Sequence, residues 1–471
     1  MGTERRTTRR VLAGLAAAAL VFAACAEEDE PEGAPTTADD GGTTVAPTDT
    51  TIGELTDSFR GVTADSIKLG FAVVDYECIA PFIDYNHGDQ DAAIDAAVEY
   101  INDNGGVLGR SIEPVKRVYC PIDPTAPNGA QAACAGFTDD DEVFAVLGVF
   151  IDFSGEAQLC LTRDKDTIHI GHELEQRWID ESPPGLMLTP DITAEKRIDV
   201  LLNLLDQEGT LAGKTVAVIT DQDTEARANA AVERFEENGL DTGSTAVLNI
   251  VDEDTAQAQT QLDSFIERWK SEDVSALLLA GGRVGAEQFV TKIKAAFPDM
   301  LLIFDMPSAA LGEGQGAKEA GIDPNPYQGA LTAEGLTAQE RWENKNASLE
   351  QCVQVYEDAT GETVLAPNDV EVVDEHQVQQ YVAVADFCGE LMMFEQIAEK
   401  AGADLTNDSW TAAANGFGVI DLPTTDSATI CEGKYAADDA FRIVEFDEDA
   451  SDVGDWAAVT EIADASGGFC G

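Results

Sequence analysis

Residues 96–115 read AAVEYINDNGGVLGRSIEPV, and this stretch decides the fold. Its first half places apolar residues at helical spacing, and the helix is expected to end at Asn104-Gly105-Gly106, because asparagine and glycine are common where helices stop. The chain then turns through Gly109-Arg110 into an apolar run at 112–119. A similar short apolar run precedes the helix at 67–74. The stretch therefore predicts two buried strands joined by a helix.

The alternation of strand and helix continues beyond this unit. It restarts after Pro183-Pro184, so that two sets of alternating elements follow one another. Such alternation is typical of right-handed βαβ units, in which parallel strands form a sheet with helices on both faces. The predicted fold class is α/β, with two Rossmann-like, doubly wound parallel-sheet lobes. The expected helices are 92–101, 129–137, one from Ser154, 193–207, 225–238 and 286–296, and the further expected strands are 143–149, 167–171, 215–220, 276–279 and 301–304.

The last third of the chain breaks this pattern. Residues 338–414 are almost entirely helical in their spacing and contain no clear strand, so they are not expected to form a third α/β domain. A strand-like run, FRIVEF at 441–446, returns near the end. The helical block is therefore expected to pack on one of the two sheets.

Residues 1–24 have the three parts of a bacterial export signal. Four arginines precede an uncharged run of 14 residues, 11–24, which ends in Ala23-Ala24. This run is shorter than the roughly 20 residues of a membrane-spanning helix. Cys25 follows directly and resembles the lipobox cysteine, which is acylated before cleavage. The alternatives are an ordinary secretory signal with an incidental cysteine, or twin-arginine export, which Thr8-Arg9-Arg10 indicates.

An acidic segment follows this cysteine. Residues 26–50 contain eight acids, no base and no aromatic residue, a composition that cannot bury enough apolar surface to fold. We therefore expect a disordered tether over 25–65. The whole chain carries a formal net charge of −61, which excludes binding to phosphate backbones as a general activity and favours solubility.

Eight cysteines remain beyond Cys25, and an even number in an exported chain predicts up to four disulfides. No C-x-x-C pair occurs, so neither a zinc ribbon nor a thioredoxin-type site is expected. Of the about 100 possible connectivities, we favour one. Its first pair lies near the carboxyl ends of adjacent strands, its second on neighbouring helices, and the other two follow by elimination. The expected pairs are Cys78 with Cys120, Cys134 with Cys160, Cys352 with Cys388, and Cys431 with Cys470.

Several stretches resemble one known family. The run at 96–115, VFAVLG at 143–148, KTVAVITDQDTEARANAAVERFEENGL at 214–240 and YVAVADFCGELMMFEQIAEKAG at 381–402 are similar to type I periplasmic binding proteins, the branched-chain amino acid (Leu/Ile/Val) receptor family. The resemblance spans nearly all of 66–446. It implies two lobes joined by a three-strand hinge, with a ligand cleft between them.

The resemblance also implies how the chain divides. Crossovers between the lobes are expected near Pro190, Leu331 and Gly418. The helical block then returns to the first lobe, which accounts for the irregular last third. The expected division is 66–189 with 331–417 for the first lobe, and 190–330 with 418–471 for the second.

Candidate ligand-binding residues follow from where the strands end. In open α/β sheets ligands bind beyond the carboxyl ends of the strands, and the resemblance places two sets of such ends on either side of a cleft. In members that bind α-amino acids, hydroxyl residues hold the ligand carboxylate at the places where this chain has Asp152 and Glu173. The candidates are Tyr76, Phe150, Asp152, Ser154, His172 and Glu173 in the first lobe, and Asp221 and Asp305 in the second.

The acids Asp152 and Glu173 argue against a plain Leu/Ile/Val specificity. A carboxylate beside a ligand carboxylate repels it unless one of the two is protonated, so an amine-bearing or hydroxylated ligand is favoured. A shift of one residue in the alignment would restore the usual pattern. Ser154 has a second interpretation, as the cap of the third helix.

The sequence thus predicts an extracytoplasmic solute-binding lipoprotein of an ABC importer, anchored at the cell surface or in the periplasm. The expected partners are a small polar ligand (amino acid-like, amide or amine), the transporter permease and the membrane, and no nucleic acid, cofactor or metal is expected. His172 and Glu173 begin HELEQ, which fails the H-E-x-x-H zinc pattern. No catalytic constellation is found, so an enzyme is not expected. The alternative is a ligand sensor that signals to a membrane partner.

Overall fold

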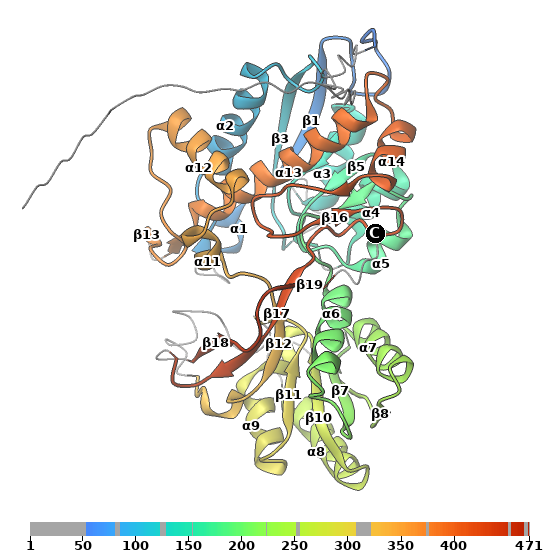
Figure 1. Cartoon of the computed structure of the whole chain (residues 1–471), viewed down its shortest axis with the longest axis vertical. Helices are drawn as coiled ribbons and strands as arrows, with labels where there is room; N and C mark the ends of the chain where they lie inside the picture. The colour runs from blue at the N-terminus through green and yellow to red at the C-terminus, as the bar shows by residue number, and fades with distance from the viewer. Residues whose placement is uncertain are drawn as a thin grey trace, which may run out of the picture. The chain divides into compact units, whose positions relative to one another are not determined.

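The computed structural model describes most of the chain after residue 52 (Figure 1). The predicted export signal, the lipidation at Cys25 and the first part of the predicted tether lie outside the described residues. Within the described part, no helix is both long enough and apolar enough to span a membrane. The described residues are 53–80, 85–122, 129–152, 154–222, 224–250, 255–307, 322–373, 376–450, 454–465 and 470.

The first sheet is parallel throughout, as the sequence predicted. Its strands run in the order β3-β1-β4-β5-β6, with β1 bonded to both β3 and β4. Each neighbouring pair in this order is parallel. The sheet and the helices packed on it are called the first lobe below. Its strands are β1 (Ser66–Val74), β3 (Ser111–Tyr119), β4 (Ala145–Leu147), β5 (Ile168–Ile170) and β6 (Met187–Leu188).

The unit that decides the fold is confirmed. Helix α2 (Gln90–Asp103) begins where the Asp89 carboxylate accepts a hydrogen bond from the Ala92 N–H at 2.9 Å, which satisfies a free donor of the first turn. It ends at Asp103 with Asn104 as its C-cap, and Gly106 follows with a φ of +66°. A Cβ at Gly106 would collide with the Arg110 carbonyl. Glycine is therefore required for the turn into β3.

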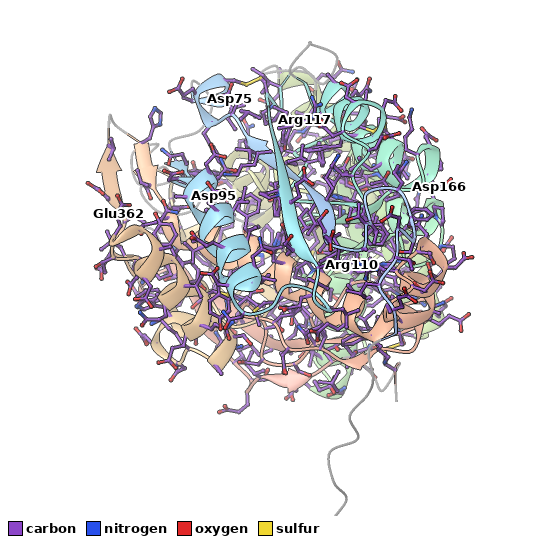
Figure 2. All side chains as sticks on the ribbon, turned by 90° about the horizontal axis from the view of Figure 1, so that it is seen from above. Asp75, Asp95, Arg110, Arg117, Asp166 and Glu362 are labelled. Carbon is purple, nitrogen blue, oxygen red and sulfur yellow. A yellow bond between two sulfur atoms is a disulfide. The ribbon has the colours of Figure 1, made fainter. Side chains whose placement is uncertain are left out.

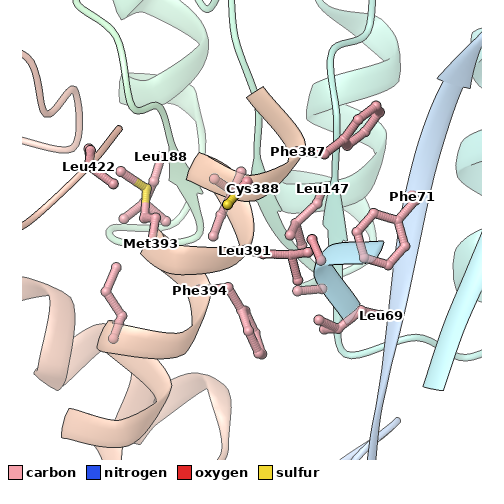
Figure 3. Close-up of a cluster of buried hydrophobic side chains, with 14 of the residues drawn as sticks. Leu69, Phe71, Leu147, Leu188, Phe387, Cys388, Leu391, Met393, Phe394 and Leu422 are labelled. Carbon is pink, nitrogen blue, oxygen red and sulfur yellow. The ribbon is translucent and has the colours of Figure 1, made fainter. Parts of the chain in front are cut away.

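Helices cover both faces of the first sheet. On one face, Leu69 and Phe71 of β1 pack against Phe387 and Leu391 of α13 in a buried cluster (Figure 3). On the other face, Phe137 and residues of α3 and α4 form a second cluster. These helices are α1 (Tyr76–Ile79), α3 (Ala130–Ala135), α4 (Glu156–Leu159), α5 (Gln176–Glu181), α11 (Ala338–Glu343), α12 (Ala347–Thr360), α13 (Gln380–Ala401) and α14 (Asn407–Asn415), with π-helical turns at Gly136–Asp140 and Cys160–Asp164.

The second sheet combines parallel and antiparallel strands. Its path is β18-β17-β12-β11-β10-β7-β8, in which β7, β10, β11 and β12 are parallel and β17 and β18 are antiparallel. This sheet and its helices are called the second lobe. Its strands are β7 (Thr215–Asp221), β8 (Asp241–Thr242), β9 (Ala246–Leu248), β10 (Val274–Ala280), β11 (Leu301–Phe304), β12 (Leu331–Glu334), β17 (Ala440–Asp447), β18 (Asp455–Ala458) and β19 (Ala463–Asp464).

Two pairs of helices sandwich the second sheet. Helices α6 (Ala194–Gln207) and α7 (Glu225–Glu237) contribute to one buried cluster, and α8 (Ala256–Ser271) and α9 (Glu287–Ala296) contribute to another. The sequence predicted α6, α7 and α9 but not α8. Outside the two main sheets lie β2 (Tyr85–Asn86), β13 (Glu371–Val373) and β14 (His376–Val378) in one small sheet and β15 (Gly418–Val419) and β16 (Thr429–Ile430) in another.

The end of the predicted tether belongs to the folded part. Val62 is buried, and the Ser58 hydroxyl donates to the Leu405 carbonyl at 2.8 Å. The buried Arg110 guanidinium, labelled in Figure 2, donates to the Thr63 carbonyl at 2.6 Å. The segment after about residue 57 is therefore ordered, because buried arginine and backbone groups need these partners. The predicted tether over 25–65 was too long at its carboxyl end.

The predicted third crossover also needs correction. Leu422 lies in the core of the first lobe, together with Leu188 and Met393 (Figure 3). Ile430 and Tyr435 belong to the same buried cluster. Residues 418–437 therefore pack on the first lobe, and we place the crossover near Asp438 instead of Gly418. The second crossover follows β12, near Gly335, since β12 pairs within the second sheet.

All four expected disulfides are confirmed. Their Cα–Cα distances of 5.9, 6.3, 5.8 and 5.7 Å lie within the range usual for disulfides. The bonded pairs are Cys78–Cys120, Cys134–Cys160, Cys352–Cys388 and Cys431–Cys470.

Much of the acidic charge lies at the surface. Figure 2 shows Asp166 and Glu362 at opposite edges of the view, and both side chains are exposed. Such residues are solvated and carry no information about a ligand. The acids that do need an explanation are the buried ones near the strand ends.

Candidate ligand-binding cleft

A cavity of about 890 Å³ lies where loops from both sheets meet the connecting segments. Phe150, Asp152 and Glu173 line it from the first lobe, as the sequence predicted. Met306 follows β11 and lines it from the second lobe. These residues come directly after strands, where parallel sheets bind ligands. The further lining residues include Leu174, Glu175, Trp178, Asp191, Arg197, Arg227, Glu334, Gly335, Ala338, Arg341, Asp438, Phe441, Asp455 and Trp456.

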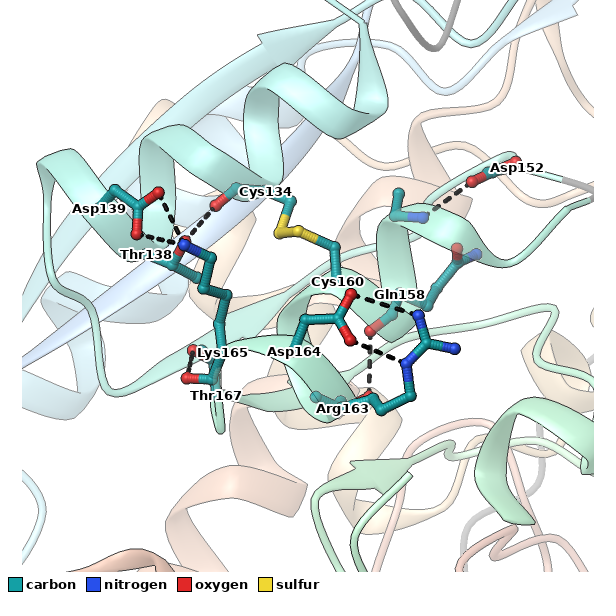
Figure 4. Close-up of a disulfide and its surroundings, with 12 residues drawn as sticks. Cys134, Thr138, Asp139, Asp152, Gln158, Cys160, Arg163, Asp164, Lys165 and Thr167 are labelled. Carbon is teal, nitrogen blue, oxygen red and sulfur yellow. Dashed lines mark hydrogen bonds and ion pairs between the residues drawn. A yellow bond between two sulfur atoms is a disulfide. The ribbon is translucent and has the colours of Figure 1, made fainter. Parts of the chain in front are cut away.

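Asp152 has a structural task within this cleft. One carboxylate oxygen accepts hydrogen bonds from the Ser154 N–H at 3.0 Å and the Ser154 hydroxyl at 2.6 Å. The other oxygen accepts from the Ala157 N–H at 2.9 Å. Figure 4 shows Asp152 beside the start of the helical segment that carries Gln158 and Cys160. Asp152 therefore caps this segment, because it satisfies N–H groups that have no partner inside the first turn.

Ser154 is exposed and does not line the cavity. Its hydroxyl donates to Asp152 and lies 3.3 Å from the Glu156 N–H. The interpretation of Ser154 as part of a helix cap agrees with these contacts. Its predicted place in the ligand site does not.

Glu173 is the predicted acid that remains directed at the cleft. Its backbone has a φ of +57°, which is uncommon for a residue with a side chain. Among the described residues no hydrogen bond to its carboxylate is found, although water in the cleft can reach it. Enclosure by the cleft walls raises its pKa, the negative charge of Asp191 raises it further, and His172 opposes both. Glu173 thus places a carboxyl group at the surface of the cleft without a hydrogen-bond partner among the described residues.

His172 lies behind the lining and holds three acids around its ring. Its Nδ1 lies 2.8 Å from an oxygen of Asp191, which does line the cleft. Its Nε2 lies 3.8 Å from Asp386 and 3.5 Å from Glu390. Burial lowers the pKa of His172, but the charges of Asp386 and Asp191 outweigh it and hold the pKa well above its usual range. The ring is therefore an imidazolium at neutral pH.

Glu390 is the deepest of these acids. It lies on α13, is 1% exposed, and neither oxygen has a hydrogen bond of good geometry from a described residue. Burial raises its pKa well above the usual range, against the opposing charge of His172. Burial also raises the pKa of Asp386. His172, Glu173, Asp191, Asp386 and Glu390 are called the His172 cluster below.

The predicted acids of the second lobe lie behind the cleft. Asp305 is 0% exposed and accepts from the Arg227 guanidinium at 3.0 Å and from the Gly281 N–H at 2.9 Å. Asp221 is also buried, and Arg283 lies 3.5 Å from it. Neither acid lines the cavity. Asp305 instead forms an ion pair with Arg227, which does line the cavity. This predicted residue therefore positions a lining side chain and does not line the cavity itself.

Tyr76 borders a separate, smaller cavity of about 330 Å³, together with Tyr85 and His376. Its ring lies 4.9 Å from that of His87 and 6.3 Å from that of Tyr85. Burial raises the pKa of Tyr76, and the charges of Tyr85 and Asp386 add to the effect. Tyr76 is thus close to the His172 cluster but does not line the main cleft.

Residues 84–451 match the family described as "Periplasmic binding protein". The chain belongs to this family. Its members are solute-binding proteins of ABC transporters and not enzymes. The cleft at the strand ends of two α/β lobes is thus the ligand site expected of a periplasmic binding protein.

Solved periplasmic binding proteins of type I share the fold. A fatty acid ABC transporter substrate-binding protein from Thermomonospora curvata matches with a TM-score of 0.52 and 17% identity, over 87% of this chain and 95% of that one. A leucine-binding protein from Thermotoga maritima matches with a TM-score of 0.53 and 14% identity, over 84% and 99%.

A third structure, a solute-binding protein from R. palustris in complex with 4-hydroxybenzoate, matches with a TM-score of 0.54 and 12% identity, over 85% of this chain and 97% of that one. Among curated proteins no relative matches this sequence. At these identities the structures establish the fold, and they assign no ligand to this periplasmic binding protein.

The sequence missed the basic residues of this periplasmic binding protein's cleft. Arg197 lies on α6, with its guanidinium 5.6 Å from the Phe441 ring. Arg227 lies on α7 and Arg341 on α11. The rule that ligands bind beyond strand ends does not identify these side chains, because they reach the cleft from helices. The signal that could have found them is their place in the first two turns of a helix that follows an expected crossover or strand end.

Proposed function

We propose that this periplasmic binding protein captures a small polar solute, an amino acid-like, amide or amine compound, for an ABC importer. The observation that supports the proposal is the cavity of about 890 Å³, which residues of both lobes and of the connecting segments line. Its size suits a small molecule. Polar and aromatic side chains occur together in its lining, as at other small-molecule sites.

The connecting segments supply the hinge of the proposed mechanism. They pass near Pro190, Gly335 and Asp438, and Gly335 and Asp438 themselves line the cleft. A ligand that contacts both lobes favours a closed form, because only that form makes all the contacts. A free ligand at a hundredfold excess over its Kd should then stabilise the protein by about 2.7 kcal/mol.

A pair of matched variants tests the proposed site. Ala338 lines the cleft, and Ala338→Trp would fill part of it. Ala359 is exposed on α12 and lies outside the lining, so Ala359→Trp adds the same ring elsewhere. A solute that raises the melting temperature of the wild type should do so for A359W but not for A338W. An equal shift in both variants would place the ligand outside this cleft.

The membrane anchor is part of the same proposal. An export signal, an acylated Cys25 and an acidic tether would hold the protein beside its permease. Mass spectrometry of the mature amino terminus should find lipid on Cys25, and Cys25→Ser should release the protein from membranes. A mature chain that starts elsewhere would contradict the anchor and leave the cleft unaffected.

Uptake separates a transporter component from a sensor. Cells that lack this protein should lose uptake of its radiolabelled ligand if it serves an importer. A sensor should instead leave uptake unchanged and alter a downstream response. Normal uptake in the deletion strain would favour the sensor.

A further inference from the structure

The His172 cluster holds more acid than the protein neutralises. Asp191 pairs with the imidazolium of His172 at 2.8 Å, and the positive charges of Arg197 and Arg341 also lower the pKa of Asp191. Asp386 and Glu390 share the remaining side of the same ring at 3.8 and 3.5 Å. Glu173 has no cation within ion-pair distance among the described residues. Positive charge is therefore short at the end of the cluster that faces the cleft.

Burial distinguishes Glu390 from the solvated acids of the surface, whereas Glu173 is exposed to the cleft and the Asp191 and Asp386 side chains are 40% and 30% exposed. Glu390 is 1% exposed, and its two oxygens have no hydrogen bond of good geometry from a described residue, since the nearby Gly148 N–H, which acts to lower its pKa, donates to Ile170. The Nε2 atom of His172 likewise has no hydrogen-bond acceptor in good geometry. A buried charge without partners is costly, and a carboxyl group relieves that cost by keeping its proton. The unliganded cluster is thus expected to retain at least one shared proton.

The cluster opens to the cleft through Glu173 and Asp191, which both line the cavity. Trp456 lines the same cavity and is partly exposed, and Phe150 and Trp178 are buried in its wall, 2% and 4% exposed. Aromatic faces attract organic cations, and a desolvated carboxylate pairs with them. The acids and rings together suit a positively charged group.

The arginines of the lining do not reverse this charge. Arg227 is bound by Asp305 at 3.0 Å and approached by Glu175 at 3.8 Å. Arg197 and Arg341 lie close enough to act on both Asp191 and Asp438. Among the described residues, three arginines and seven carboxyl groups line the cleft, and the carboxyl groups belong to Asp152, Glu173, Glu175, Asp191, Glu334, Asp438 and Asp455.

We propose that the ligand is an organic cation, an ammonium or guanidinium compound without a carboxylate, which binds against Glu173 and Asp191 and releases a proton from the His172 cluster to solvent. This inference rests on the proposed function, since it names the solute class of the same cleft. The incoming positive charge replaces the proton, so the net charge of the His172 cluster together with the ligand stays compensated.

Other titratable groups face the cluster and set its pH range. Tyr381 on α13 and Tyr76 after β1 keep their protons, because burial raises the pKa of both. His87 stays neutral, because burial lowers its pKa to about 4. Burial raises the pKa of Asp438, near the third crossover, to about 7. Asp438 therefore titrates close to neutral pH and needs its own control.

The first test compares solute classes. Choline, agmatine and putrescine are cations without a carboxylate, L-leucine is a zwitterion, and 4-hydroxybenzoate is an anion. At least one of the cations should raise the melting temperature and bind in titration calorimetry, and affinity should increase from about pH 6 to about pH 8 as the cluster ionises. No binding by any of the three cations would overturn the inference. Binding of leucine or the benzoate alone would overturn it and leave the proposed function intact.

The second test removes single charges. Glu173→Gln should weaken binding of the cation by at least about tenfold. Glu350→Gln removes an exposed acid of α12 that lies outside the lining, and it should leave the affinity unchanged. Equal affinities of E173Q and the wild type would contradict the contact with Glu173.

The third test counts protons. Calorimetry in buffers of different ionisation enthalpy should show release of about half to one proton per cation bound. Glu390→Gln should keep cation binding but at least halve that release, whereas Asp438→Asn should preserve it. A purely structural role of Glu390 would change affinity and leave the proton count as it was. Binding without proton release in the wild type would refute the proposed exchange.

Discussion

On the second-lobe side of the cleft, Asp305 accepts hydrogen bonds from Arg227 and Gly281, and Asp221 has Arg283 3.5 Å away. On the first-lobe side, Glu390 and Asp386 share His172 with Asp191, and Glu173 has no cation of its own among the described residues. Both sides place an acid after a parallel strand, Glu173 after β5 and Asp305 after β11, whereas Asp386 and Glu390 lie on α13.

The difference lies in where the compensating charge comes from. In the second lobe Arg227 compensates the charge of Asp305 through one carboxylate oxygen and is thereby fixed before a ligand arrives, while the other Asp305 oxygen has no hydrogen-bond partner among the described residues. In the first lobe the acids of the His172 cluster are not fully paired with cations of the protein. A positively charged ligand can therefore still pair with them. A buried charge is stable only when it is paired, so the unpaired side is the one that we expect to select the solute.

The largest change in the free energy of unfolding should come from breaking the Asp305–Arg227 ion pair on the second-lobe side. Asp305→Ala would leave Arg227 beside a cavity and without its main partner, and the free energy of unfolding should fall by about 3 to 5 kcal/mol. Urea denaturation measures this loss. Asp299→Ala, at an exposed acid of the same lobe, is the control and should change little. A small loss in D305A would show that the second side is less firmly paired than its contacts indicate.

Removing Glu390 from the first-lobe side should instead increase the free energy of unfolding. Glu390 keeps its proton in the folded state and loses it in the unfolded state at neutral pH, so wild-type stability falls as pH rises above the unfolded pKa of about 4.3. Glu390→Gln removes this linkage and should stabilise the unliganded protein by about 1 to 2 kcal/mol near pH 7.

The pH dependence is the sharper measurement of that variant. The gain from E390Q should grow between about pH 5 and about pH 8, by at most about 1.4 kcal/mol per pH unit. Chemical denaturation at several pH values would record it, with Glu350→Gln as the matched control. A gain that does not change with pH would mean that Glu390 is already ionised in the folded protein.

A smaller effect should separate two acids of the same lobe. Asp152→Ala removes the acceptor for the Ser154 and Ala157 N–H groups and should cost about 1 kcal/mol of stability. Binding should change less than in E173Q, because both Asp152 oxygens are already occupied by the protein. Parallel melting and titration experiments test both points. A D152A protein of normal stability that fails to bind would return Asp152 to the ligand site.

The smallest expected change is the stability of E173Q itself. Because the Glu173 carboxylate has no hydrogen-bond partner among the described residues, the substitution should alter the free energy of unfolding by less than about 0.5 kcal/mol. Denaturation of the unliganded variant measures this directly. A large loss would show that Glu173 supports the fold, and its effect on binding would then be indirect.

Local signals allowed much of the fold to be predicted. The helix with its C-cap at Asn104 and the turn at Gly106 follow from spacing and from the conformational freedom of glycine, which neighbouring residues determine. Helix α8 had an equally readable signal, since Ala258, Leu262 and Trp269 recur on one buried face, but it was not assigned.

Other features depend on contacts between distant segments. Nothing in the local pattern near Leu422 says that this segment packs against α13, so the third crossover was placed too early. Val62 likewise is buried by contacts with distant residues of the first lobe. Its local sequence does not reveal these contacts, so the predicted tether extends too far.

The site could be predicted only as far as strand ends determine it. Glu173 and Phe150 line the cleft because the residue after a parallel strand reaches that edge of the sheet. Asp305 also follows a strand, yet its side chain turns back to meet Arg227. Whether an acid after a strand faces the ligand or forms an ion pair depends on whether a basic residue of a helix, here Arg227 of α7, lies beside it. The sequence of the strand does not contain that information.

The disulfide between Cys431 and Cys470 closes a covalent ring, and β17, β18 and β19 lie inside it. The ring starts beside the core of the first lobe at Ile430 and runs through the second sheet before it closes. A protease that cuts once between the two cysteines would therefore release no fragment until the disulfide is reduced. This periplasmic binding protein can accordingly be nicked within its third crossover and still remain a single molecule.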